Sequence, residues 1–149
     1  MIERNSTMIV PYTPDQMFDL VANVEDYPKF LPWCVALRIV EHKPAPPFEE
    51  ILSDMVVSYK VFREKFRSRV HLDRGNSTIH AQYENGPFHE LKTVWKFTPD
   101  DENNTKVDFH IRFEFKNFIM QAAAKQVFEK AFARMNEAFI ARADEIYTR

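Results

Sequence analysis

The hydrophobic pattern changes its period at Asn117, and this change restricts the fold more than any other feature of the sequence. From Thr105 to Phe115, apolar and polar residues alternate, which predicts a strand of an antiparallel sheet with one buried and one wetted face. After Asn117 the apolar residues recur at spacings of three, four or seven, and neither proline nor glycine occurs after Pro99. One long C-terminal helix is therefore predicted. Its apolar stripe consists of Ala124, Phe128, Ala131, Met135, Phe139 and Ile146.

The remainder of the chain predicts one strand, two short helices and about six strands before that helix. Thr13-Pro14-Asp15-Gln16 is a helix start, because threonine can cap, proline suits the first helical position and Gln16 can complete a capping box. A second short helix is expected from Glu25 to Phe30. Period-two patterns dominate residues 33–115. The fold class is therefore α+β, an antiparallel sheet covered by one long helix, in a single domain over residues 1–149.

A glycine turn at Gly75-Asn76 predicts the register of one hairpin. A two-residue turn with glycine first separates the apolar side chains of both strands from the polar ones, which supports this register. The pairs on the apolar face are Leu72 with Ile79, Val70 with Ala81 and Ser68 with Tyr83, and those on the opposite face are Arg69 with Gln82 and His71 with His80.

Composition and charge exclude several classes of function. The net charge is −2, with 20 basic and 22 acidic residues well mixed, which argues against DNA or other nucleic acid as a partner held by phosphate contacts. Two glycines in 149 residues leave no glycine-rich phosphate loop. Cys34 is the only cysteine, so no intramolecular disulfide is expected. Because no signal-peptide or membrane-spanning run is found, we expect a cytoplasmic protein that meets the inner membrane, if at all, from its surface.

The aromatic content indicates either a phenylalanine-rich core or a cavity with rigid apolar walls. The chain has 14 Phe, 5 Tyr and 2 Trp, and periodicity alone leaves both interpretations open. If a cavity exists, the expected ligand-binding residues are Trp33, Phe66, Tyr83, Phe88, Trp95, Phe97, Phe109, Phe113, Phe128, Met135 and Phe139. The expected tunnel mouth or membrane contact consists of Phe30, Leu31, Pro32 and Pro87.

Polar chemistry inside such a cavity is sparse. Tyr59, Ser68 and Tyr83 are the candidate hydrogen-bond donors to a bound carbonyl group. His71 and His80 would face each other, but a third ligand is missing, so no metal site is expected. No acid–base pair can be placed inside, so we expect no catalytic residue and no cofactor beyond a bound ligand.

Several motifs resemble the coenzyme Q-binding START-domain family, which also includes polyketide-cyclase-like proteins and the ribosome-association toxin group. The resemblance begins with Tyr12-x-x-x-x-Met-Phe-Asp-Leu-Val21 and Tyr27-Pro-Lys-Phe-Leu-Pro-Trp-Cys34. It continues through Phe66-x-Ser-x-Val-x-Leu72, Gly86-Pro87-Phe88, Trp95-x-Phe97 and Phe113-Glu-Phe115, and so covers nearly the whole chain. It implies a helix-grip fold (START/Bet v 1-like) with a hydrophobic tunnel between the sheet and the C-terminal helix.

The same resemblance implies three functions, which we rank. The first is non-catalytic binding of ubiquinone or a related isoprenoid lipid in support of respiratory electron transport. The second is association with the large ribosomal subunit. The third is catalysis as a polyketide cyclase or aromatase, which would require an acid or base positioned in the cavity. Fold-level similarity does not choose among them.

Overall fold

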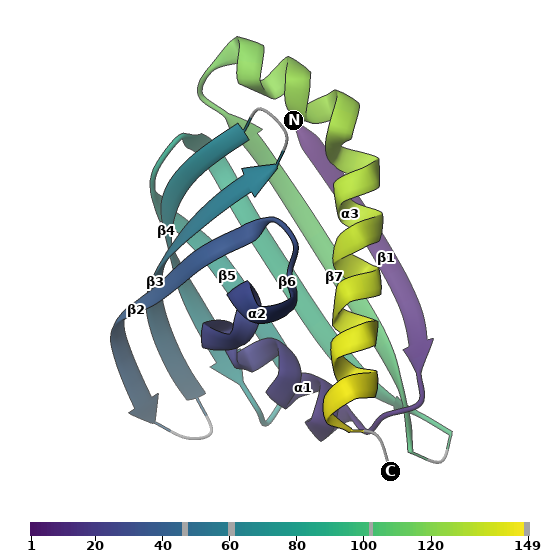
Figure 1. Ribbon diagram of the computed structural model, residues 1–149. Coiled ribbons are helices and arrows are strands. Elements are labelled where there is room, and N and C mark those ends of the chain that lie inside the picture. Colours follow the sequence, from purple (N-terminus) through teal and green to yellow (C-terminus); the bar gives the residue numbers. More distant parts are fainter. Residues whose placement is uncertain (46–47, 60–61, 102, 148–149) are drawn as a thin grey trace.

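A seven-stranded antiparallel sheet and one long helix form the molecule (Figure 1). The computed structural model describes residues 1–45, 48–59, 62–101 and 103–147. The strand order is β1-β7-β6-β5-β4-β3-β2, so the first strand joins the last, and the predicted fold class is confirmed. The elements are β1 (Ile2–Val10), α1 (Pro14–Ala22), the 3-10 helix η1 (Val24–Asp26), α2 (Tyr27–Phe30), β2 (Cys34–Ala45), β3 (Phe48–Tyr59), β4 (Phe62–Asp73), β5 (Thr78–Asn85), β6 (Phe88–Asp100), β7 (Asn104–Phe115) and α3 (Phe118–Ile146).

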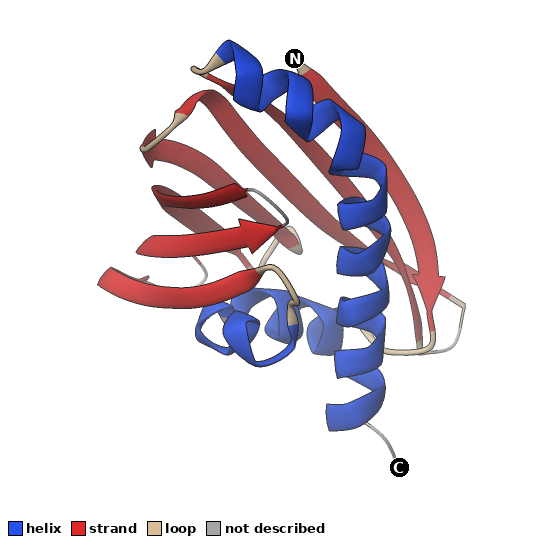
Figure 2. Cartoon of the chain, turned by 45° about the horizontal axis from the view of Figure 1, so that its top comes forward, coloured by secondary structure: helices blue, strands red, loops and turns tan. Residues whose placement is uncertain are grey.

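The sheet is strongly curved, and α3 runs along its concave face (Figure 2). The helix begins where the period changes, since the Asn117 side chain caps it by accepting a hydrogen bond from the backbone N–H of Met120 at 3.0 Å. Ala124, Met135 and Phe139 of the predicted stripe are buried and Phe128 and Ala131 are half-buried, but the last member, Ile146, is 44% exposed. Ala143 is instead the last buried residue of the helix, because the final turn extends beyond the core. Phe132 is also buried, although the predicted stripe omits it.

The two short helices pack on the same face of the sheet as α3. Thr13 and Gln16 form the predicted capping box at the start of α1, which buries Met17 and Phe18 against the sheet. The second predicted helix is a turn of 3-10 helix followed by α2. The two short helices, α1 and α2, lie beside the C-terminal half of α3 (Figures 1 and 2). They therefore cover one end of the concave face.

The β4–β5 hairpin has the predicted register but a different turn. All five predicted pairs occur in the ladder. The turn, however, comprises residues 74–77 between the paired Asp73 and Thr78, and Ser77, not Gly75, has the left-handed backbone (φ 52°). Asp73 accepts hydrogen bonds from the backbone and side-chain N–H groups of Asn76, so its carboxylate supports the longer turn. The four-residue loop is centred on the same two residues as the predicted turn. Every residue of the ladder therefore keeps its predicted partner, and the register prediction is correct.

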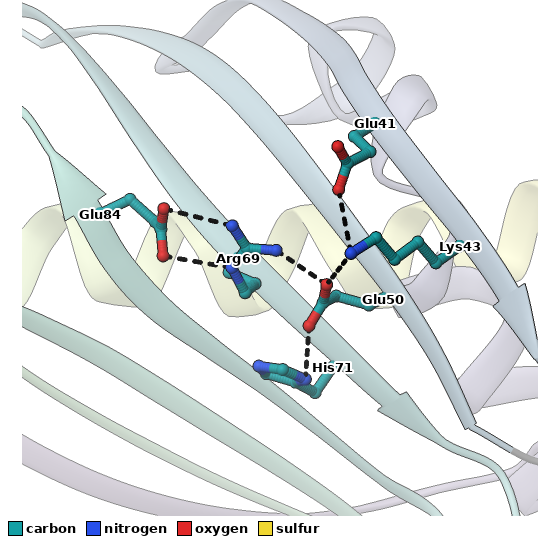
Figure 3. Close-up of polar contacts among 6 residues, drawn as sticks. All are labelled: Glu41, Lys43, Glu50, Arg69, His71 and Glu84. Carbon is teal, nitrogen blue, oxygen red and sulfur yellow. Dashed lines mark hydrogen bonds and ion pairs between the residues drawn. The ribbon is translucent and has the colours of Figure 1, made fainter.

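The outer face of β2 to β5 carries a network of ion pairs (Figure 3). Arg69 donates to Glu84 and to Glu50, and Glu50 also contacts Lys43 and His71. These charges alternate in sign along the surface and satisfy one another. The charged side chains of these strands thus pair with one another on the outer face of the sheet, and the apolar side chains face α3.

Candidate ligand-binding site

Two adjoining pockets separate the concave face of the sheet from α3. Their volumes are about 210 Å³ and about 190 Å³. Together they extend from α2 and the middle of the sheet to the N-terminal part of α3. Six residues line both pockets, namely Trp33, Phe66, Leu91, Ile111, Phe128 and Ala131. The space between sheet and helix is therefore hollow, and the interpretation of the aromatic residues as a mere core filling is incomplete.

Most of the predicted ligand-binding residues lie on these walls. The larger pocket is lined by eight of them, Trp33, Phe66, Tyr83, Trp95, Phe109, Phe128, Met135 and Phe139. Phe88 and Phe113 line the smaller pocket. Phe97 lines neither, because it is 2% exposed and packs edge-on against Phe18 of α1. The α1 helix covers that end of β6, so Phe97 belongs to the core below the cavity.

The predicted mouth residues lie in different surroundings. Leu31 is buried and lines the larger pocket. Phe30 packs against Phe139 with ring centroids 5.3 Å apart, Pro32 is exposed, and Pro87 is half-buried. Two other apolar side chains are strongly exposed, Phe118 at 85% and Ile119 at 76%, both in the first turn of α3. Contact of the Phe30–Pro32 segment and Pro87 with a membrane stays a prediction.

Sequence reasoning missed part of the wall. Phe132 of α3 is buried and lines the larger pocket, with its ring centroid 5.9 Å from that of Phe109. It follows Phe128 by four positions, so helical spacing was a sufficient signal. Leu37 and Met55, on β2 and β3, also line the pocket. Their strands show weak alternation, and register shifts in β2 obscure it further.

The lining is almost free of polar chemistry. No Asp, Glu, Lys, Arg or His among the described residues lines either pocket. Tyr27 donates its hydroxyl to the Val21 carbonyl, and burial raises the pKa of Tyr27 well above its usual range. The donors that remain are the hydroxyls of Ser53, Ser68, Tyr83 and Thr93, the amide of Gln82 and the indole N–H groups of Trp33 and Trp95. The side chain of Tyr59, the other predicted donor, lies outside the described residues.

Cys34 lies next to the cavity without lining it. The side chain is 3% exposed, and its thiol is 3.8 Å from the carbonyl oxygen of Ala36. Burial raises the pKa of the Cys34 thiol to about 11, so it stays protonated at neutral pH. The site can therefore enclose and orient an apolar molecule, but none of the described groups on its walls is a ready acid, base or nucleophile.

The curved sheet, the gripping helix and the enclosed apolar space define a START-like helix-grip protein. Residues 10–140 match the family model described as polyketide cyclase/dehydrase and lipid transport, and the chain belongs to this family. The relatives include the ribosome association toxin RatA of Escherichia coli (strain K12), 36% identical over 99% of this chain and 90% of that protein. The mitochondrial coenzyme Q-binding protein coq10 of Schizosaccharomyces pombe is 27% identical over 93% of this chain and 84% of that protein.

Solved structures agree with this assignment. The 18 kDa protein CC1736 from Caulobacter crescentus covers all of this chain and is covered fully by it, with a TM-score of 0.83 and 32% identity. A START superfamily protein from Mycobacterium smegmatis has a TM-score of 0.80 at 15% identity, with 97% and 98% coverage, and so supports the fold alone. Within the described residues, no helix has the length and apolar character needed to cross a bilayer.

Proposed function

We propose that this protein binds an elongated apolar molecule in the two adjoining pockets and does not transform it chemically. The observation that carries the proposal is the hollow between the sheet and α3, which is walled by aromatic and aliphatic side chains and lined by no charged described residue. Such a preformed apolar cavity with a few polar groups is typical of lipid and cofactor sites. Membership in a family whose description includes lipid transport agrees with this proposal.

Energetics favour reversible binding. A tail of three isoprenoid units offers about fifteen carbons, and burying each contributes ~0.8 kcal/mol, or roughly 12 kcal/mol in total. Association itself costs on the order of 4–15 kcal/mol. Apolar contact alone would therefore give modest affinity, which suits a protein that must also release its ligand. Ubiquinone is one candidate of this kind, supported by the coenzyme Q-binding relative from S. pombe.

The test uses the tryptophans as reporters, since Trp33 and Trp95 both line the larger pocket. Titration with a short-tailed ubiquinone should quench their fluorescence saturably. Ala131 lines both pockets, so Ala131→Phe should fill the space between them and weaken binding at least about tenfold. The matched control is Ala122→Phe, on an exposed position of the same helix. Absence of saturable quenching by any isoprenoid or alkyl probe in folded, ligand-free protein would overturn the proposal.

A second function, association with the ribosome, has the better support from relatives. The proteins named ribosome association toxin from Escherichia coli (strain K12) and Rickettsia prowazekii are 36% identical to this chain over 98–99% of its length, whereas the coenzyme Q-binding relative is 27% identical. We propose ribosome association as the cellular role for which the cavity protein is used, with the large subunit as the partner. The mixed charges of the outer face neither require nor oppose it.

Co-sedimentation distinguishes this role from quinone binding. Purified protein should migrate with large ribosomal subunits through a sucrose cushion, and not with small subunits. Ala131→Phe separates the two functions, because it fills the cavity and leaves the surface unchanged. The variant should bind quinone more weakly and still co-sediment with large subunits. Co-sedimentation with neither subunit would overturn the ribosomal role and leave ligand binding to stand on the fluorescence result.

Catalysis as a polyketide cyclase has the weakest support. The solved Zhui aromatase/cyclase from Streptomyces shares the fold at a TM-score of 0.81, but its identity to this chain is 16%. Turnover of a polyketide substrate, abolished by replacing one polar cavity residue, would establish that activity in place of simple binding.

A further inference from the structure

Three hydroxyl-bearing residues form one rung across the inner face of the sheet. Ser53 of β3 lies opposite Ser68 of β4, and Ser68 lies opposite Tyr83 of β5. All three line the larger pocket. The rungs on both sides of this one are apolar. They consist of Met55 with Phe66 on one side and of Ile51, Val70 and Ala81 on the other.

The two serines are buried without hydrogen-bond partners. Ser53 is 2% exposed and Ser68 is 8% exposed, and neither hydroxyl makes a hydrogen bond to any other described residue. The Tyr83 hydroxyl accepts a hydrogen bond from the backbone N–H of Phe88 at 3.1 Å, which leaves its own proton for another acceptor. Buried hydroxyl groups in native proteins are nearly always paired, since an unpaired one destabilises the fold. Two unpaired serine hydroxyls and the unused proton of the Tyr83 hydroxyl, on one cavity wall, therefore point to a partner in the ligand.

The chemistry of that partner follows from what surrounds the rung. Hydroxyls can donate to and accept from a neutral oxygen. No cationic side chain among the described residues lines the pockets, so a carboxylate or phosphate buried here would lack a counter-charge. A pure hydrocarbon would leave the hydroxyls unpaired. A neutral alcohol or carbonyl group satisfies both conditions.

We infer that the Ser53–Ser68–Tyr83 rung binds the neutral hydroxyl or carbonyl group of an otherwise apolar chain molecule. This contact determines which class of ligand binds and in which orientation the ligand lies in the cavity. The inference rests on the proposed cavity function and specifies it. Because the rung lines only the larger pocket, the polar end lies there and the tail extends past Phe66 and Phe128 into the smaller pocket. The protein thus selects against fatty acids and lipid phosphates of equal length.

Three probes with the same farnesyl chain test this selectivity, namely farnesol, farnesene and farnesoic acid at pH 8. Each is measured by its displacement of the fluorescent dye N-phenyl-1-naphthylamine from the folded protein. Wild type should bind farnesol about tenfold or more tightly than either of the others, as expected for one or two hydrogen bonds in an apolar site. The double variant Ser53→Ala/Ser68→Ala should lose that preference while its affinity for farnesene stays equal or rises. Ser58→Ala, on the same strand but lining neither pocket, should behave as wild type.

The outcomes separate the rung from the cavity. Equal binding of all three probes, or a farnesol preference that persists in the double variant, would overturn the rung assignment and leave the cavity function intact. Tighter binding of farnesoic acid would also overturn it. If neither the dye nor any farnesyl probe binds, the proposed ligand-binding function itself fails, and the inference fails with it. Tyr83→Phe offers a third removal of a hydroxyl at nearly constant volume.

Discussion

Arg67 on β4 donates two hydrogen bonds to Asp54 on β3, from Nε to Oδ1 at 2.7 Å and from Nη2 to Oδ2 at 3.0 Å. The two residues are cross-strand neighbours in the ladder, on the face opposite the cavity. Arg38 adds a longer contact of 3.4 Å from the other side. Asp54 is only 7% exposed, and the hydrogen bonds from Arg67 hold the pKa of its carboxyl below its ordinary value despite the opposing effect of burial.

This pair predicts a specific pH dependence of stability. Asp54→Asn should lower the free energy of unfolding by about 2 kcal/mol at pH 7, since charge-assisted hydrogen bonds are lost. The pKa of Asp54 is lower in the folded state than in the unfolded state, so its contribution is complete above about pH 4 and is lost as the pH falls through the folded-state pKa. Urea denaturation at pH 7 and at pH 3 should therefore show the gap between wild type and variant narrowing in acid. An equal gap at both pH values would contradict the assignment.

Gly86 should tolerate alanine poorly, whereas Gly75 should accept it. The backbone of Gly86 has φ 147°, and an added Cβ would lie 2.7 Å from the Cβ of Phe66 and 3.0 Å from its Cα. Gly86→Ala should destabilise the fold by about 2 kcal/mol or more. A Cβ on Gly75 would meet only Asp73 Oδ1, at 3.6 Å, so Gly75→Ala should change stability by less than about 1 kcal/mol. Thermal melts of the two variants side by side provide the comparison, and similar losses would refute it.

Cys34 should react slowly with thiol reagents in the folded protein. The thiolate is the reactive form, and burial raises the thiol pKa to about 11, so at pH 7.5 its thiolate fraction is about a hundredfold below that of a free cysteine. Alkylation by iodoacetamide should be slower by at least this factor than in urea. The rate should rise about tenfold for each pH unit. A fast reaction in native protein, independent of pH, would show that the thiol is exposed and ionised.

Most of the fold followed from periodicity because each element buries one face. The alternation from Thr105 to Phe115 and the helical spacing after Asn117 correspond to β7 and α3 almost to the residue. Turn chemistry was less predictable. Gly75 suggested a glycine-first turn, but the Asp73 carboxylate supports a longer one that places Ser77 in the left-handed region. Side-chain-to-backbone hydrogen bonds of this kind leave no trace in a hydrophobic pattern.

The cavity could be predicted only as one of two alternatives. A phenylalanine that fills a core and one that lines a hollow have the same pattern in the sequence, as Phe97 and Phe109 show. The two differ because α1 packs over Phe97, a contact between elements that lie far apart in the chain. Ser53 was missed for a related reason, since a single serine in a strand has no meaning until its register with Ser68 is known.

Ser53 and Ser68 also allow a prediction about the empty protein. Replacing a buried hydroxyl that has a partner costs stability, whereas replacing one without a partner removes an unfavourable group. Thr105 is the matched comparison, because it is fully buried and donates its hydroxyl to the Tyr12 carbonyl at 2.6 Å. Thr105→Val should therefore lower the free energy of unfolding by about 1–2 kcal/mol.

In the same urea denaturation, the ligand-free double variant Ser53→Ala/Ser68→Ala should be as stable as wild type or more stable, by up to about 1 kcal/mol. A site that binds ligand through unpaired groups commonly reduces the stability of the empty fold, and the gain on their removal measures that effect. If the double variant instead lost as much stability as Thr105→Val, the two serines would be satisfied within the folded protein, through water or a neighbouring group. Their hydroxyls would then have no unused hydrogen-bonding capacity for a ligand. Among the three farnesyl probes, the protein would be expected to show no preference for farnesol.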